Sequence, residues 1–77
     1  MSRDEVMEIV LSEIPKVVDC SKIELTGETD LIDELGFSSF TFFILMTRLE
    51  QRTGVFVMER KVRRMETIDD IVNGLME

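Results

Sequence analysis

The sequence predicts an all-α fold, a small four-helix bundle with three main helices and a short third helix. Apolar side chains recur at helical spacing in three segments, which lie near residues 3–14, 39–53 and 68–76. A long stretch without a sustained period separates the first two of these segments. Because apolar helical faces of a small chain bury themselves against one another, three such faces predict a bundle. Seventy-seven residues suit one domain, so we expect residues 1–77 to share a single core.

The first helix is predicted to begin after Ser2, whose hydroxyl can accept a hydrogen bond from an otherwise unpaired backbone N–H. Pro15 disfavours helical geometry at the residue before it, so we expect this helix to end near Ile14. One stripe of the helix is apolar and comprises Val6, Ile9, Val10 and Ile14.

Residues 16–37 are predicted to form a long loop, because Asp, Ser, Thr and Gly interrupt every apolar run. Long ordered loops of small domains are often functional or held by buried anchors. The expected anchors are Val18, Ile23, Leu25, Leu31, Ile32 and Leu35. Four acids at positions 28, 30, 33 and 34 lack the alternating ligands and mid-loop glycine of a calcium loop, so we expect no metal site.

The central helix is predicted to begin at Ser39, with Gly36 allowing a sharp turn and Ser38 acting as the cap. Gly54, just after Thr53, is expected to end it. The face predicted to be buried comprises Phe42, Leu45, Met46 and Leu49, with Phe43 beside it. The opposite side carries Phe40, Ile44, Thr47, Arg48 and Gln51.

Residues 55–58 are apolar and too short to distinguish a strand from a buried loop. Residues 61–65 fit one or two helical turns, with Val62 and Met65 inward, and with Arg63, Arg64 and the preceding Arg60 outward. Thr67 and Asp70 resemble a capping box that opens the last helix. The apolar stripe of that helix comprises Ile68, Ile71, Val72, Leu75 and Met76.

Composition excludes several classes of function. The chain contains no histidine, so it has no Ser-His pair and no zinc site built from Cys and His, and we expect no catalytic residues. Cys20 is the single cysteine, so the chain cannot form an internal disulfide. No apolar segment resembles a signal peptide or is long enough to enter a membrane. We therefore expect a cytoplasmic protein, and we expect it to be a monomer. A net charge of −7 argues against nucleic acid. Residues 48–64 nevertheless carry six bases and only two acids.

The run Asp30-Leu31-Ile32-Asp33-Glu34-Leu35-Gly36-Phe37-Ser38-Ser39-Phe40 resembles the signature of the acyl carrier protein family, which includes the peptidyl carriers. That signature has an acidic loop, Leu-Gly, and then Asp-Ser-Leu at the start of the second helix. The resemblance continues to the last helix and so covers nearly the whole chain. It implies a four-helix bundle with 4′-phosphopantetheine on Ser39, which would carry acyl or aminoacyl groups as thioesters.

The resemblance also implies partners, namely a phosphopantetheinyl transferase and enzymes that load or transfer acyl or aminoacyl groups. The residues expected to face them are Ser38, Phe40, Thr41, Ile44 and Arg48. Ser38 stands where the signature has aspartate, Phe40 where it has leucine, and residues 59–64 are basic where the family is often acidic. Because charge complementarity decides which partners dock, we expect a specialised carrier with dedicated partners, in lipid modification or secondary metabolism.

Two other functions fit parts of the sequence. An unmodified interaction module with the same fold would explain the serine at position 38. A small helical nucleic-acid binder would use Arg60 to Arg64, although four bases in a chain of charge −7 are a weak electrostatic footprint. Within the carrier interpretation, Phe42, Phe43 and Met46 are expected to fill the interior, which favours short or aromatic cargo, or chains held outside.

Overall fold

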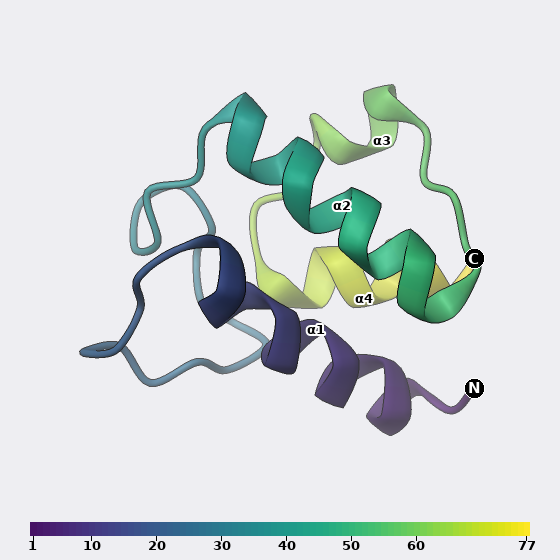
Figure 1. Cartoon of the computed structure of the whole chain (residues 1–77), viewed down its shortest axis with the longest axis horizontal. Coiled ribbons are helices and arrows are strands. Elements are labelled where there is room, and N and C mark those ends of the chain that lie inside the picture. Colours follow the sequence, from purple (N-terminus) through teal and green to yellow (C-terminus); the bar gives the residue numbers. More distant parts are fainter.

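The computed structural model describes all 77 residues and contains four helices and no strands. In chain order these are α1 (Arg3–Val17), α2 (Ser39–Thr53), α3 (Glu59–Val62) and α4 (Ile68–Met76). α1 packs against both α2 and α4, and Figure 1 shows the short α3 beside α2 and the long loop at one end of the bundle. The predicted all-α fold with three main helices and a short third one is therefore confirmed.

The start of α1 is confirmed, but its predicted end is wrong. The Ser2 hydroxyl accepts from the Glu5 backbone N–H at 3.2 Å, and the Glu5 carboxylate accepts from the Ser2 N–H at 2.9 Å, which completes a capping box. The helix continues through Pro15, and the Val18 N–H still donates to the Ile14 carbonyl at 3.1 Å. Pro15 is exposed and removes one donor in the last turn, so its cost stays local.

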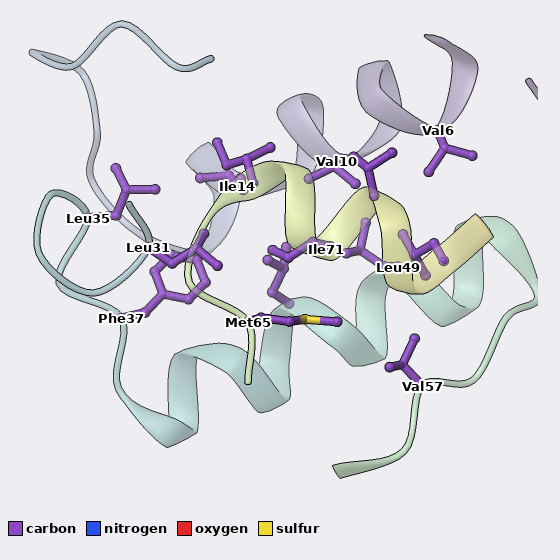
Figure 2. Packing of buried hydrophobic residues seen from close by; sticks show 14 of the residues in the cluster. Val6, Val10, Ile14, Leu31, Leu35, Phe37, Leu49, Val57, Met65 and Ile71 are labelled. Carbon is purple, nitrogen blue, oxygen red and sulfur yellow. The ribbon is translucent and has the colours of Figure 1, made fainter. Parts of the chain in front are cut away.

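The core is formed by one face of each long helix together with anchors from the loops (Figure 2). Leu31 and Leu35 are buried as predicted, and Phe37 joins them, whereas Ile32 is exposed. Beyond these anchors the buried apolar residues are Val6, Val10, Ile14, Cys20, Leu45, Leu49, Val57, Met65, Ile68, Ile71, Val72 and Leu75.

Two further side chains expected at the core are exposed. Phe43 has 69% of its surface accessible, and Met76, in the last turn of α4, has 42%. The four-residue α3 is too short to cover the Phe43 side of α2. Residues 55–58 form a loop rather than a strand, and Val62 and Met65 point inward as predicted.

The long loop docks on the start of α4. Backbone hydrogen bonds join Leu31 N–H to the Glu66 carbonyl at 2.8 Å, Ile68 N–H to Thr29 at 3.2 Å, and Asp69 N–H to Gly27 at 2.8 Å. The loop therefore pairs N–H groups that the first turn of a helix leaves free. The predicted Thr67–Asp70 capping box is also present. No helix is long and apolar enough to cross a bilayer.

Candidate functional site

The two adjacent serines at the start of α2 have different surroundings. The Ser38 hydroxyl accepts from the Thr41 backbone N–H at 3.3 Å and lies 3.1 Å from the Thr41 hydroxyl. Ser39 is the first residue of the helix; its side chain is exposed and makes no hydrogen bond. Ser38 is therefore the cap, as predicted, while the Ser39 hydroxyl is free to react.

The acidic turn before these serines is an organised structure. The Asp30 carboxylate accepts from the Ile32 and Asp33 N–H groups at 2.9 and 2.7 Å, and the Glu34 carboxylate accepts from the Asp30 N–H at 2.8 Å. Gly36 has a φ of 70°, which reverses the chain before the helix. Asp30 and Glu34 thus use their carboxylates to fix the turn.

Phe37 attaches this turn to α2. Its ring is buried and meets the Phe42 ring edge-on, with centroids 5.0 Å apart and planes at 74°. Its N–H donates to the Leu31 carbonyl at 2.9 Å. Since Phe37 directly precedes Ser38, these contacts fix where the two serines lie.

The first turn of α2 also offers two donors. The backbone N–H groups of Ser39 and Phe40 have no partner within the chain, because Thr41 is the first residue whose N–H is capped. Free N–H groups and the positive end of the helix dipole favour an anion at this position. A phosphodiester attached here would therefore suit the residues present.

A cleft of about 690 Å³ begins at Ser38 and Ser39 and extends between α2 and α3. Phe42 and Met46 are half-buried in its wall. They line the cleft, whereas the sequence predicted that they fill the interior. Phe43 lines it from an exposed position. The other lining residues are Ile32, Phe37, Thr47, Glu50, Phe56, Val57, Glu59, Val62, Arg63 and Met65.

The five residues expected to face partners differ in how exposed their side chains are. Phe40 is 70% exposed, and Ser38 is exposed but bonded to Thr41. Thr41 and Ile44 are half-buried. The guanidinium of Arg48 is directed back to α1, where its Nε lies 2.6 Å from Oε1 of Glu13.

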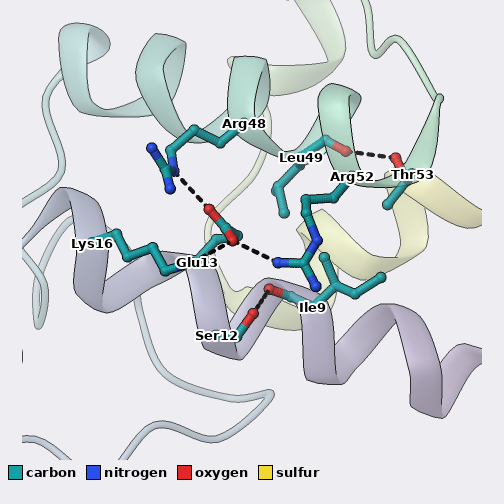
Figure 3. A network of polar contacts seen from close by, with 8 residues as sticks. All are labelled: Ile9, Ser12, Glu13, Lys16, Arg48, Leu49, Arg52 and Thr53. Carbon is teal, nitrogen blue, oxygen red and sulfur yellow. Dashed lines mark hydrogen bonds and ion pairs between the residues drawn. The ribbon is translucent and has the colours of Figure 1, made fainter.

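Glu13 is a buried acid that the sequence interpretation missed. Its side chain is only 2% exposed. Its carboxylate accepts hydrogen bonds from Arg48 at 2.6 Å, Arg52 at 2.7 Å and Lys16 at 3.0 Å (Figure 3). Burial raises the pKa of Glu13, but the hydrogen bonds from the three bases outweigh it and lower the pKa to about 2. Two signals could have revealed this cluster: Glu13 follows the stripe of Val6 and Val10 at helical spacing, and Arg48 and Arg52 are four residues apart.

Comparison with known proteins adds three findings. The family model described as "Phosphopantetheine attachment site" matches residues 8–75. The chain is 32% identical over 72 residues to the acyl carrier protein of Thermotoga maritima, an alignment that covers 94% of this chain and 89% of that protein. A solved structure of a candidate acyl carrier protein from Mycobacterium tuberculosis superposes with a TM-score of 0.82 at 24% identity, which covers 92% of this chain and 95% of the other.

The family match extends over most of the chain, and the structural likeness independently supports the fold. An exposed, unbonded serine hydroxyl, two free backbone donors and an adjoining apolar cleft suit a pantetheine phosphodiester and its cargo. The chain therefore belongs to the acyl carrier protein family, whose members are carriers that hold 4′-phosphopantetheine as a covalently attached cofactor.

Proposed function

We propose that this protein carries acyl or aminoacyl groups as thioesters on 4′-phosphopantetheine attached to Ser39. The observation that carries the proposal is the difference between the two serines. The Ser38 hydroxyl is occupied by the cap on Thr41, while the Ser39 hydroxyl is exposed and unbonded at the mouth of the cleft.

The chain supplies placement, and its partner supplies the chemistry. A phosphopantetheinyl transferase would remove the Ser39 proton while the Ser39 oxygen bonds to the phosphorus of the pantetheinyl phosphate of coenzyme A. The phosphoanhydride bond breaks, and the nucleotide leaves. The free N–H groups of Ser39 and Phe40 would be available as donors to the phosphodiester. The pantetheine thiol supplies the atom that holds the cargo as a thioester, and the chain itself catalyses no reaction.

We further propose that the carrier is a monomer with dedicated partners, in lipid modification or secondary metabolism. Ser38, Phe40, Thr41, Ile44 and Arg48 would form the face that meets them. Phe40 is the most exposed of the five. Arg48 would contribute through its stem and through the part of its guanidinium that Glu13 does not hold, since its side chain is 42% exposed.

Mass spectrometry after co-expression with a broad-specificity phosphopantetheinyl transferase tests the attachment. We expect a mass gain of one phosphopantetheinyl group, its absence in Ser39→Ala, and its retention in the matched variant Ser38→Ala. No gain with several transferases would instead favour an unmodified interaction module. A gain that Ser38→Ala abolishes and Ser39→Ala retains would move the site by one residue.

A further inference from the structure

Four basic side chains gather on α3 and the turn that follows it. Arg60, Lys61, Arg63 and Arg64 are all exposed. Lys61 lies 3.4 Å from the Glu77 carboxylate and Arg63 lies 2.8 Å from that of Glu59, and in both pairs the side chains are about half exposed or more. Arg60 and Arg64 make no ion pair or side-chain hydrogen bond. Because exposed pairs are weak, all four charges remain available to a partner.

Most bases outside this group are already committed within the chain. Glu13 holds Lys16, Arg48 and Arg52. Arg3 bonds Asp69 and Asn73. The remaining base, Lys22, is exposed and lies in the long loop. In a chain of net charge −7, the uncommitted positive charge is therefore concentrated on α3.

Exposed apolar side chains adjoin these bases. Phe56 is 71% exposed and Met58 is 48% exposed; Met58 directly precedes α3, and Phe56 lies two residues before Met58. Phe56 and Arg63 line the same cleft as Ser39. Figure 1 shows α3 at the outer edge of the bundle, alongside α2. Large apolar side chains with arginines around them are the composition enriched at protein interfaces. We call this group the α3 surface, formed by Phe56, Met58, Arg60, Lys61, Arg63 and Arg64.

We infer that the α3 surface docks a partner protein through an acidic patch that surrounds apolar side chains. The inference rests on the carrier function proposed above, because a partner seated there would cover the side of the cleft and lie close to the group on Ser39. Charge complementarity is the argument: the surface is basic and its anchors are apolar, so a partner with the opposite charge around apolar groups fits both.

A protein fits better than a nucleic acid or an anionic membrane. Both of those present extended negative charge, which would also meet the acids of a chain with net charge −7. A small acidic patch on a protein acts within a Debye length of about 8 Å at physiological salt and so can meet α3 alone. The same charges would repel partners that present basic patches, which gives the surface selectivity.

The test uses two amphipathic helical peptides with the same Leu and Phe face, one flanked by glutamates and the other by lysines. Each is titrated into the ¹⁵N-labelled full chain, without the prosthetic group, at low salt. We expect the glutamate peptide to shift amide signals of residues 56–64, and the lysine peptide to leave them in place. Arg60→Glu and Arg64→Glu should each weaken binding of the glutamate peptide by about threefold to tenfold, because each reverses one charge.

Lys22→Glu is the matched control, because it makes the same charge change at an exposed base that also lacks an ion pair. It should leave binding unchanged. Equal weakening by Lys22→Glu would show that only net charge matters and would overturn the inference, as would shifts away from α3. If duplex DNA or phosphatidylserine vesicles bound residues 56–64 more tightly than the glutamate peptide does, the inference would also be overturned, because the surface would then belong to a different ligand.

The carrier function is checked separately by the mass gain on Ser39. Arg60→Glu/Arg64→Glu should still be loaded to completion by the transferase, because neither residue contacts Ser39. Failure to load the wild-type chain would defeat the proposed function and leave the peptide result standing. Loss of peptide discrimination with normal loading would defeat the α3 inference alone.

Discussion

Arg48 Nε lies 2.6 Å from Glu13 Oε1, although the two residues are 35 positions apart in the chain. The contact joins α1 to α2 at a carboxylate that is almost fully buried. Arg52 and Lys16 complete the set of bases around it. One acid thereby links the two long helices and engages part of the positive charge of α2 within the chain.

Replacing Glu13 by Gln should destabilise the fold by on the order of 2 kcal/mol at pH 7. The change keeps the volume of the side chain but removes the charge that three bases share. Urea denaturation at pH 7 measures the loss. Glu8→Gln, at an exposed position of the same helix with no ion pair, is the control and should change stability by less than about 0.5 kcal/mol.

The wild-type chain should lose the same contribution in acid. The pKa of Glu13 is about 2 in the folded state against an ordinary value of 4.5, so its stabilisation is complete above pH 4.5 and fades as the pH falls toward 2. The three bases are about half exposed, and solvent screens their charges. We therefore expect Glu13 to contribute on the order of 2 kcal/mol to the free energy of unfolding, which is less than the full change in its pKa would correspond to. The stability difference between the wild type and Glu13→Gln should therefore shrink from pH 7 to pH 3. A constant difference would contradict this assignment.

Ser38→Ala should lower stability by about 1 kcal/mol, because the Thr41 N–H loses its acceptor. Ser38→Asp should retain the cap and add a charge that favours the helix N-terminus. Thermal unfolding of the two variants measures both effects. If Ser38→Ala is as stable as the wild type, the cap contributes nothing and the distinction between the serines is weakened.

Gly27→Ala should destabilise the docking of the loop on α4. A Cβ at this position would lie 2.6 Å from the Asp69 Cγ, while the Gly27 carbonyl accepts from the Asp69 N–H. We expect a loss on the order of 1 to 2 kcal/mol. The double variant Gly27→Ala/Asp69→Ala should recover part of it, because the clash is removed. Additive losses in this double-mutant cycle would show that the two residues do not interact.

The cleft should shield a bound acyl chain from water. With an eight-carbon acyl group on the prosthetic group, we expect thioester hydrolysis to be severalfold slower than in a free pantetheine thioester. Met46→Trp, which enlarges a side chain in the cleft wall, should reduce that protection. Phe40→Trp is the control: it enlarges an exposed side chain outside the cleft and should leave the protection against hydrolysis unchanged. Equal hydrolysis rates in the wild type and the free thioester would favour cargo held outside.

Local patterns in the sequence determined much of the fold. The caps at Ser2, Ser38 and Thr67 were predicted because capping depends on residues within four positions of one another. The left-handed Gly54, with a φ of 74°, ends α2 for the same local reason. Helical periodicity likewise identified most of the buried faces. Pro15 was the exception, because α1 continues through it instead of ending before it. A proline in the last turn of a helix removes only one backbone donor, so it costs little there.

Tertiary structure decided what local spacing cannot contain. Phe43 and Ile32 have the hydrophobicity of core residues, but α3 is too short to cover the first, and the side chain of the second is exposed to solvent on the turn. Glu13 has the charge of a surface residue and is buried only because three bases converge on it from two helices. The sequence thus determined the family and the two serines, from residues close together in the chain. Only packing between distant segments decided where the cleft opens and which positive charges face solvent, because both depend on contacts that residue spacing does not encode.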